Sequence, residues 1–186
     1  MAVRNINEGI SSWNNKKPFP RDRYAITCIE ETFGLSKSSD NPMITRVWEI
    51  SSPETVQQGD KKMNVAGLKI NQYVTTKVKD PKTGGWDAEA SDKNFGRFRD
   101  ELVLMGFTEE AIDDEAPPLF AKGKTVDAIV YAKADKARKS PTPEQLAKGQ
   151  KQGDPIKDQD GKEVVTYQLA IDSILGLSTT QVGANY

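Results

Sequence analysis

Apolar and other side chains alternate along the run VAGLKINQYVTTKV, residues 65–78. Even-numbered positions from Leu68 to Val74 are mainly apolar, and odd-numbered positions from Lys69 to Thr75 are polar or amphipathic. A period of two places successive side chains on opposite faces of a β-strand. This run is therefore predicted to be a strand with one face in the core and the other in water.

Four further runs are rich in β-branched and aromatic residues and are separated by turn formers, which is typical of strands. They are residues 24–31, 43–51, 124–135 and 163–174. The clearest helical period is that of residues 91–107, with Phe95, Phe98 and Leu102 on one face, and a second short helix is expected over residues 108–115. Ser91 or Asp92 is the expected helix cap. The predicted order is three strands, one helix and two strands.

This order matches the OB architecture, a partly open Greek-key barrel that binds oligonucleotides on strands 2 and 3 and on loops 1-2 and 4-5. The sequence thus predicts a mainly β fold, a five-stranded OB-like barrel with a helix between strands 3 and 4 and a long 4-5 loop. A generic α+β sandwich with an edge helix is the alternative. The expected organisation is an extended basic lead-in (1–23), one domain (24–175) with a long mobile loop (134–162), and a flexible tail (176–186).

Histidine is absent from the 186 residues, and Cys28 is the only cysteine. The commonest general base, the commonest zinc ligand and every Ser-His or Cys-His pair are thereby removed, together with disulfides within the chain. We expect no enzyme, no cofactor and no metal site. The apolar runs are far shorter than the roughly 20 residues of a membrane span, and the first residues lack a secretory signal. A cytoplasmic chain without membrane contact is expected.

Three segments carry a resemblance to a known family: PFPRDRYAITCIEETFGLSKSSDNPMITRVWEI, FGRFRDELVLMGF and LFAKGKTVDAIVYAKAD. Their marks are the lead-in Pro20–Tyr24, the turn Ser36–Met43, the helix end Leu102–Phe107 and the strand start Gly123–Val126. In these features the chain resembles tailed-phage single-stranded-DNA-binding proteins of OB type. The resemblance spans residues 18–133 and the last strand, and it implies single-stranded DNA as the ligand and replication or recombination proteins as partners. The acidic tail common in such proteins has no counterpart in the last ten residues.

The net charge is -1, so the case for a polyanionic ligand depends on where the charges lie. Single-strand binders combine a cationic groove with aromatic faces on which bases stack. Candidates of both kinds occur on strand 2, on strand 3 and beyond it, and at the mouth of the 4-5 loop. They are Arg46, Trp48, Lys69, Tyr73, Lys77, Lys79, Trp86, Tyr131 and Lys133.

Each aromatic candidate also has a purely structural interpretation. Trp48 shares its side of the strand with Ile44 and Ile50, which favours the core as much as a stacking surface. Tyr131 shares its side of the strand with Ile129, as expected of a residue that covers the helix. Trp86 can equally be an anchor of its loop. Tyr73 is the strongest candidate, because its neighbours on the same face are polar.

The function predicted from these features is sequence-tolerant binding of single-stranded DNA by phosphate electrostatics and base stacking. The alternative is a protein-interaction or virion-associated module on the same barrel, without nucleic-acid binding. A carboxylate-dependent nuclease is a third class, and it would need acidic residues that converge in one cleft.

Overall fold

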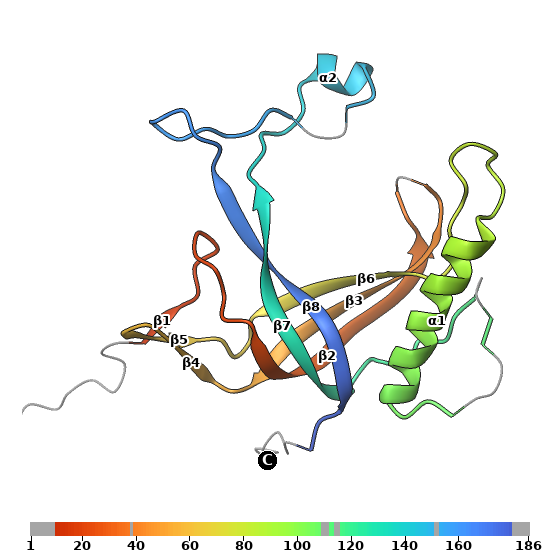
Figure 1. Ribbon diagram of the computed structural model, residues 1–186, viewed down its shortest axis with the longest axis horizontal. Helices are drawn as coiled ribbons and strands as arrows, with labels where there is room; N and C mark the ends of the chain where they lie inside the picture. Colours follow the sequence, from red (N-terminus) through yellow and green to blue (C-terminus); the bar gives the residue numbers. More distant parts are fainter. Residues whose placement is uncertain (1–9, 38, 109–111, 114–115, 151–152, 180–186) are drawn as a thin grey trace, which may run out of the picture.

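A computed structural model describes residues 10–37, 39–108, 112–113, 116–150 and 153–179. Its main sheet has five antiparallel strands (Figure 1). In spatial order they are β6 (Lys69–Thr75), β3 (Pro42–Ser52), β2 (Asp22–Leu35), β7 (Thr125–Lys136) and β8 (Val165–Leu177). The prediction of a mainly β fold is confirmed.

The main sheet is curved but is not a closed barrel. Its edge strands β6 and β8 come into contact without being paired through hydrogen bonds. The only long helix in the described part of the chain, α1 (Ala88–Leu104), follows β6 and packs against both β6 and β8. The helix therefore covers the place where the two edges of the sheet approach each other.

A second, smaller sheet lies beside the first at the left of Figure 1. It consists of β1 (Ile10–Ser12), which runs parallel to β5 (Lys61–Asn64), and β4 (Thr55–Gln58), which is antiparallel to β5. None of the strands predicted from the sequence includes residues 55–64. The turn at Gly59 has a φ of 59°, a left-handed conformation that glycine adopts without strain, and it closes the β4–β5 hairpin.

Helix α1 begins earlier than its sequence pattern predicts. Asp87 is the N-cap, and its carboxylate accepts a hydrogen bond from the backbone N–H of Ala90 at 3.0 Å. Ser91, one of the two predicted caps, is buried and instead binds the backbone of Val78. The helix ends at Met105, and Gly106 follows with a φ of 86°.

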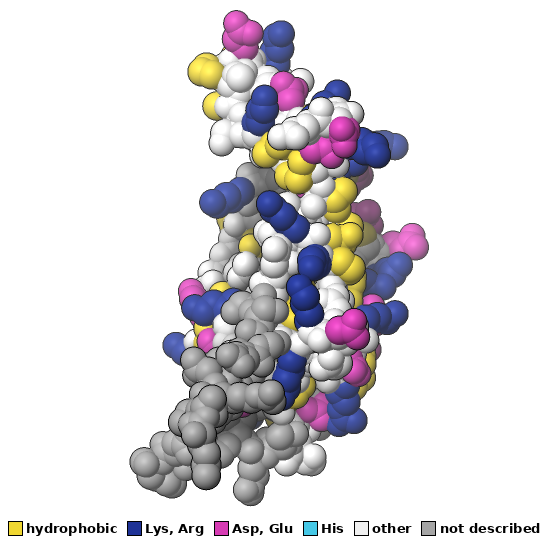
Figure 2. All heavy atoms as spheres, turned by 90° about the vertical axis from the view of Figure 1, so that its left-hand side faces the viewer, with side chains coloured by type: hydrophobic (Ala, Val, Ile, Leu, Met, Phe, Trp, Pro, Cys, Tyr) yellow, Lys and Arg dark blue, Asp and Glu magenta, His cyan; other side chains and the backbone are white. Residues whose placement is uncertain are grey.

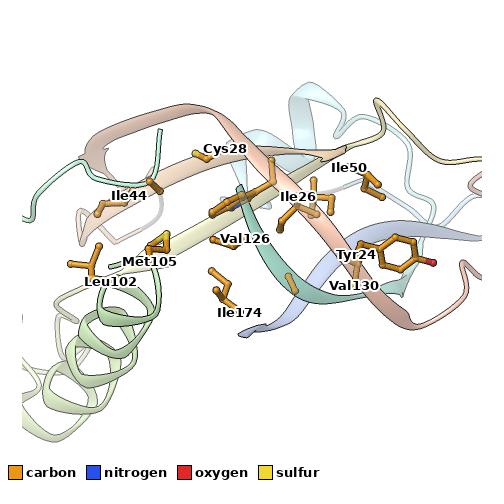
Figure 3. Close-up of a cluster of buried hydrophobic side chains, with 14 of the residues drawn as sticks. Tyr24, Ile26, Cys28, Ile44, Ile50, Leu102, Met105, Val126, Val130 and Ile174 are labelled. Atoms are coloured by element: carbon orange, nitrogen blue, oxygen red, sulfur yellow. The ribbon is translucent and has the colours of Figure 1, made fainter. Parts of the chain in front are cut away.

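The core lies between the curved main sheet and α1. Figure 3 shows side chains from β2, β3, β7, β8 and the end of α1 pointing into one interior, among them Ile26, Ile44, Leu102 and Ile174. Cys28 is part of this core, and burial raises the pKa of its thiol to about 11. The cysteine is thus a small buried residue of the apolar core.

The ends of the domain differ from the predicted boundaries. Phe19, inside the predicted lead-in, is buried against Tyr24, and β2 already begins at Asp22. At the other end β8 continues to Leu177. Residues 1–9 and 180–186 lie outside the described part of the chain.

Strands β7 and β8 continue past the sheet as a two-stranded projection, in which Lys133–Lys136 pair with Val165–Gln168 (Figure 1). We call residues 133–168 the β7–β8 arm. The predicted loop from 134 to 162 is therefore partly strand, and its tip carries the short helix α2 (Pro143–Ala147), which is capped by Thr142. Within the described residues, no helix is long and apolar enough to cross a membrane.

Candidate nucleic-acid interface

Arg46 and Trp48 point into the core and not toward solvent. Both side chains are fully buried, and they alternate along β3 with half-buried residues on the outer face of the sheet. The sequence pattern correctly placed them on the same side as Ile44 and Ile50, but that side is the interior. Neither residue can contact a ligand at the surface, so both are removed from the candidate interface.

Arg46 is instead the centre of a buried polar network. Its Nε donates to Glu31 Oε1 at 2.8 Å and its Nη1 donates to Glu101 Oε2 at 2.8 Å. Trp48 donates its indole N–H to Gln72 Oε1 at 2.9 Å, and Gln72 also donates to Glu101. Burial raises the pKa of Glu101, although the charge of Arg46 acts to lower it. This network joins β2, β3, β6 and α1.

The outer face of β6 carries Lys69 and Tyr73, as predicted from the alternation. Lys69 is exposed and Tyr73 is 63% exposed, whereas Ile70 between them is buried. Thr45 is the cross-strand neighbour of Tyr73, and Glu49 is that of Lys69. The carboxylate of Glu49 therefore moderates the positive charge at this end of the strand.

Tyr73 also borders a hollow of about 310 Å³ between β6, α1 and β8. Asn94 and Arg97 of α1 line the same hollow, and Arg97 is exposed. Arg97 is not among the predicted site residues, because the sequence pattern of the helix indicates only an apolar packing face. Helical spacing could have identified Arg97, because it directly precedes the buried Phe98 and lies beside the apolar face of the helix.

Trp86 lies in the segment that connects β6 to α1, and two lysines contact its ring. The ammonium of Lys77 is 4.8 Å from the ring centroid and that of Lys79 is 5.7 Å away. Lys79 and Trp86 form an isolated antiparallel bridge, and the Lys79 N–H donates to Asn41 Oδ1 at 2.9 Å. We call this segment, residues 76–87, the Trp86 loop. It is thereby fixed beside the β2–β3 turn, and Trp86 is 43% exposed.

Tyr131 and Lys133 lie elsewhere on the molecule, at the base of the β7–β8 arm. Tyr131 is half-buried opposite Ala170, and Lys133 is exposed opposite Gln168. In the sheet, β7 is separated from β6 by β3 and β2 on one side and by β8 on the other. The predicted site residues therefore do not form one continuous group.

Comparison of the chain with protein-family models, with curated proteins and with solved structures finds no match. Within the described residues, no cluster of three or more His, Cys, Asp or Glu side chains is placed to hold a metal ion. Five of the predicted residues lie on or next to β6, and Arg97 of α1 lies near them. Each of the six carries a positive charge or an aromatic ring, and we call them the β6 surface: Lys69, Tyr73, Lys77, Lys79, Trp86 and Arg97.

Proposed function

We propose that this chain is a sequence-tolerant single-stranded-DNA-binding protein of the kind that serves phage-type replication or recombination. It binds by phosphate electrostatics and base stacking and performs no chemistry of its own. The observation that carries the proposal is the exposed ring of Tyr73, which shares the outer face of β6 with Lys69 and borders the same hollow as Arg97. The remainder of the β6 surface follows directly along the chain.

Stacking explains why such binding tolerates many sequences, since every base presents a π-face. Stacking on one aromatic side chain contributes about 1–3 kcal/mol per base. Lys69 and Tyr73 are four residues apart, a separation of about 13 Å along an extended strand. A nucleic-acid strand that follows β6 therefore meets a cation, a ring and then the lysines of the Trp86 loop in turn.

We further propose that the fold is an OB-like barrel that stays open between β6 and β8. The order of strands in the main sheet, the contact between its two edges and the position of α1 between β6 and β7 in the chain support this assignment. In that architecture β3 and β6 are strands 2 and 3, whose outer face is the usual binding surface. Lys69 and Tyr73 of the β6 surface are on the exposed side of β6, which supports the proposal.

Titration with oligo(dT) at low and high salt tests the proposed function. Tryptophan fluorescence should be quenched on binding, and salt should reverse the quench because phosphate contacts release counterions. R97E should weaken binding and reduce the slope of log K against log salt by about 0.7, the value for one phosphate contact on a single strand. R99E is the matched control, because Arg99 is exposed on the same helix but does not line the hollow of Tyr73.

The proposal fails if the protein shows no salt-sensitive binding to oligo(dT), or if R97E and R99E have equal effects. One observation favours a protein partner in that case. Phe33 and Leu35 are 40% and 61% exposed, and they line a second hollow with Tyr73 on the β2–β3–β6 part of the sheet. An interaction module would use these apolar side chains, and its binding would be largely independent of salt.

A further inference from the structure

Trp13 lines a hollow of about 480 Å³ that is separate from the β6 surface. The hollow lies between the segment that follows β1 and the β4–β5 hairpin of the small sheet. Lys17 and Asn14 line it from the first side, and Gln58, Lys61 and Met63 line it from the second. An aromatic ring, two cations and two side-chain amides thus face one opening.

Several contacts hold the Trp13 ring in place. Its indole N–H donates to the carbonyl oxygen of Lys17 at 3.0 Å, and its edge packs on Phe19 with the ring centroids 5.5 Å apart. Gln58 donates to the carbonyl oxygen of Pro18, which ties the hairpin to this segment. The polar atom of the indole is therefore already satisfied, and the ring contributes apolar π surface to the hollow. Among the described contacts, no cation stacks on this ring.

The surroundings of the hollow are positively charged. Lys17 and Lys61 are exposed, and so are Lys16 and Lys62 next to them. Figure 2, which views this side of the molecule, shows Lys and Arg side chains in a broken line from the β7–β8 arm past the small sheet. A backbone hydrogen bond from the Tyr167 N–H to the Asn15 carbonyl oxygen, 2.7 Å long, connects the Trp13 segment to the arm. The acidic residue nearest to Lys61 along the chain is Asp60, which lies in the turn of the β4–β5 hairpin.

We propose that the Trp13 hollow is a second nucleotide-binding site, in which one base stacks on Trp13 while Lys17 and Lys61 contact the adjoining phosphates. The identity of the ligand as single-stranded nucleic acid rests on the proposed function, but the site uses none of the residues of the β6 surface. A nucleobase with a phosphate combines the flat ring and the negative charge that these side chains complement. The same chemistry is present in a free nucleotide, so both sources belong in the test.

Fluorescence of variants that each lack one exposed tryptophan separates the two sites. In W86F the remaining tryptophans are Trp13 and the fully buried Trp48, which cannot stack on a ligand. Oligo(dT) should quench the W86F protein, and salt should reverse the quench. Thymidine monophosphate should quench it only at much higher concentration if a strand is the ligand, and at equal concentration if the site takes a free nucleotide.

The charge contacts are tested in the same W86F protein. K17E/K61E should reduce the slope of log K against log salt for the Trp13 quench by about 1.4, two phosphate contacts at about 0.7 each. K16E/K62E is the matched control, since it makes the same charge change with exposed lysines that do not line the hollow. Circular dichroism confirms that each variant is folded.

The two proposals fail in different ways. If W13F is quenched by oligo(dT) and W86F is not, the second site is refuted and the β6 surface stands. If W86F is quenched and W13F is not, the Trp13 hollow stands and Trp86 is not a stacking residue. Equal effects of K17E/K61E and K16E/K62E refute the phosphate contacts, and no binding by either protein refutes both proposals.

Discussion

Replacement of Arg46 by leucine is expected to destabilise the fold strongly without a direct effect on ligand binding. The guanidinium is fully buried, and its removal leaves two carboxylates without their counter-ion. Breaking a buried ion pair by removing one partner costs about 3–5 kcal/mol. The Glu31 side chain is fully buried, whereas that of Glu101 is 25% exposed and can be partly hydrated. The expected loss is therefore about 4 kcal/mol, most of it from Glu31.

Urea unfolding followed by far-UV circular dichroism measures this loss as a lower midpoint at an unchanged m-value. The double variant R46L/E31Q should recover at least about 1 kcal/mol relative to R46L, because the uncompensated carboxylate is then removed. A loss of less than about 1 kcal/mol in R46L would contradict the role of Arg46 as the counter-ion of Glu31 and Glu101.

K69L is the complementary variant to R46L, because it changes a residue assigned to the surface and not to the core. Lys69 is exposed on the outer face of β6, and a surface substitution of this kind changes stability by about 0.5 kcal/mol or less. It should nevertheless weaken binding to oligo(dT). If folded R46L loses binding and K69L does not, the assignment of the two residues to core and surface is wrong.

Two further predictions concern pH. Burial raises the pKa of Glu101. The stability linked to this group is therefore fully present below its unfolded pKa and is lost as pH rises through the folded pKa. In urea titrations, the loss of unfolding free energy caused by E101Q should become smaller from acidic to neutral pH. Burial acts to raise the pKa of Asp127, but hydrogen bonds from Arg23 and Ser178 and the charge of Arg23 hold it below its usual value. The stability that Asp127 contributes is present above its unfolded pKa and is lost as pH falls through its folded pKa. D127N should therefore cost stability at neutral pH and progressively less in acid. A cost of D127N that does not depend on pH would contradict this assignment.

The alternation along β6 was sufficient to predict which of its residues face water. Ile70 is buried while Lys69 and Tyr73 are exposed. The alternation allows only this assignment, because a shift of one residue would turn every apolar side chain of the strand toward water. The same rule identified the side of β3 that holds Arg46, but it could not say that this side is the core. The partners that neutralise Arg46 are 15 and 55 residues away in the sequence, and no local pattern reveals them.

The small sheet and its hollow were not predictable for a different reason. Strands β4 and β5 have four residues each, too few to establish a period, and β5 depends on parallel pairing with β1 about 50 positions earlier. Trp13 lies in the segment predicted to be an extended basic lead-in. Its role as the wall of a hollow depends on the hairpin that packs against it, which is a tertiary contact.

The contacts of the aromatic rings also rank the contributions expected from the β6 surface. The ammonium groups of Lys77 and Lys79 lie over the Trp86 ring. A base that stacks on the face they occupy displaces them, and an exposed cation–π contact contributes about 0.5–1 kcal/mol. No described cation–π contact involves the Tyr73 ring, so stacking there has no such cost. Y73A should therefore weaken binding to oligo(dT) more than W86A, even though tryptophan has the larger ring. The reverse order would mean that the released lysines gain more from phosphates than the ring loses, and that the Trp86 loop is the principal contact of the β6 surface.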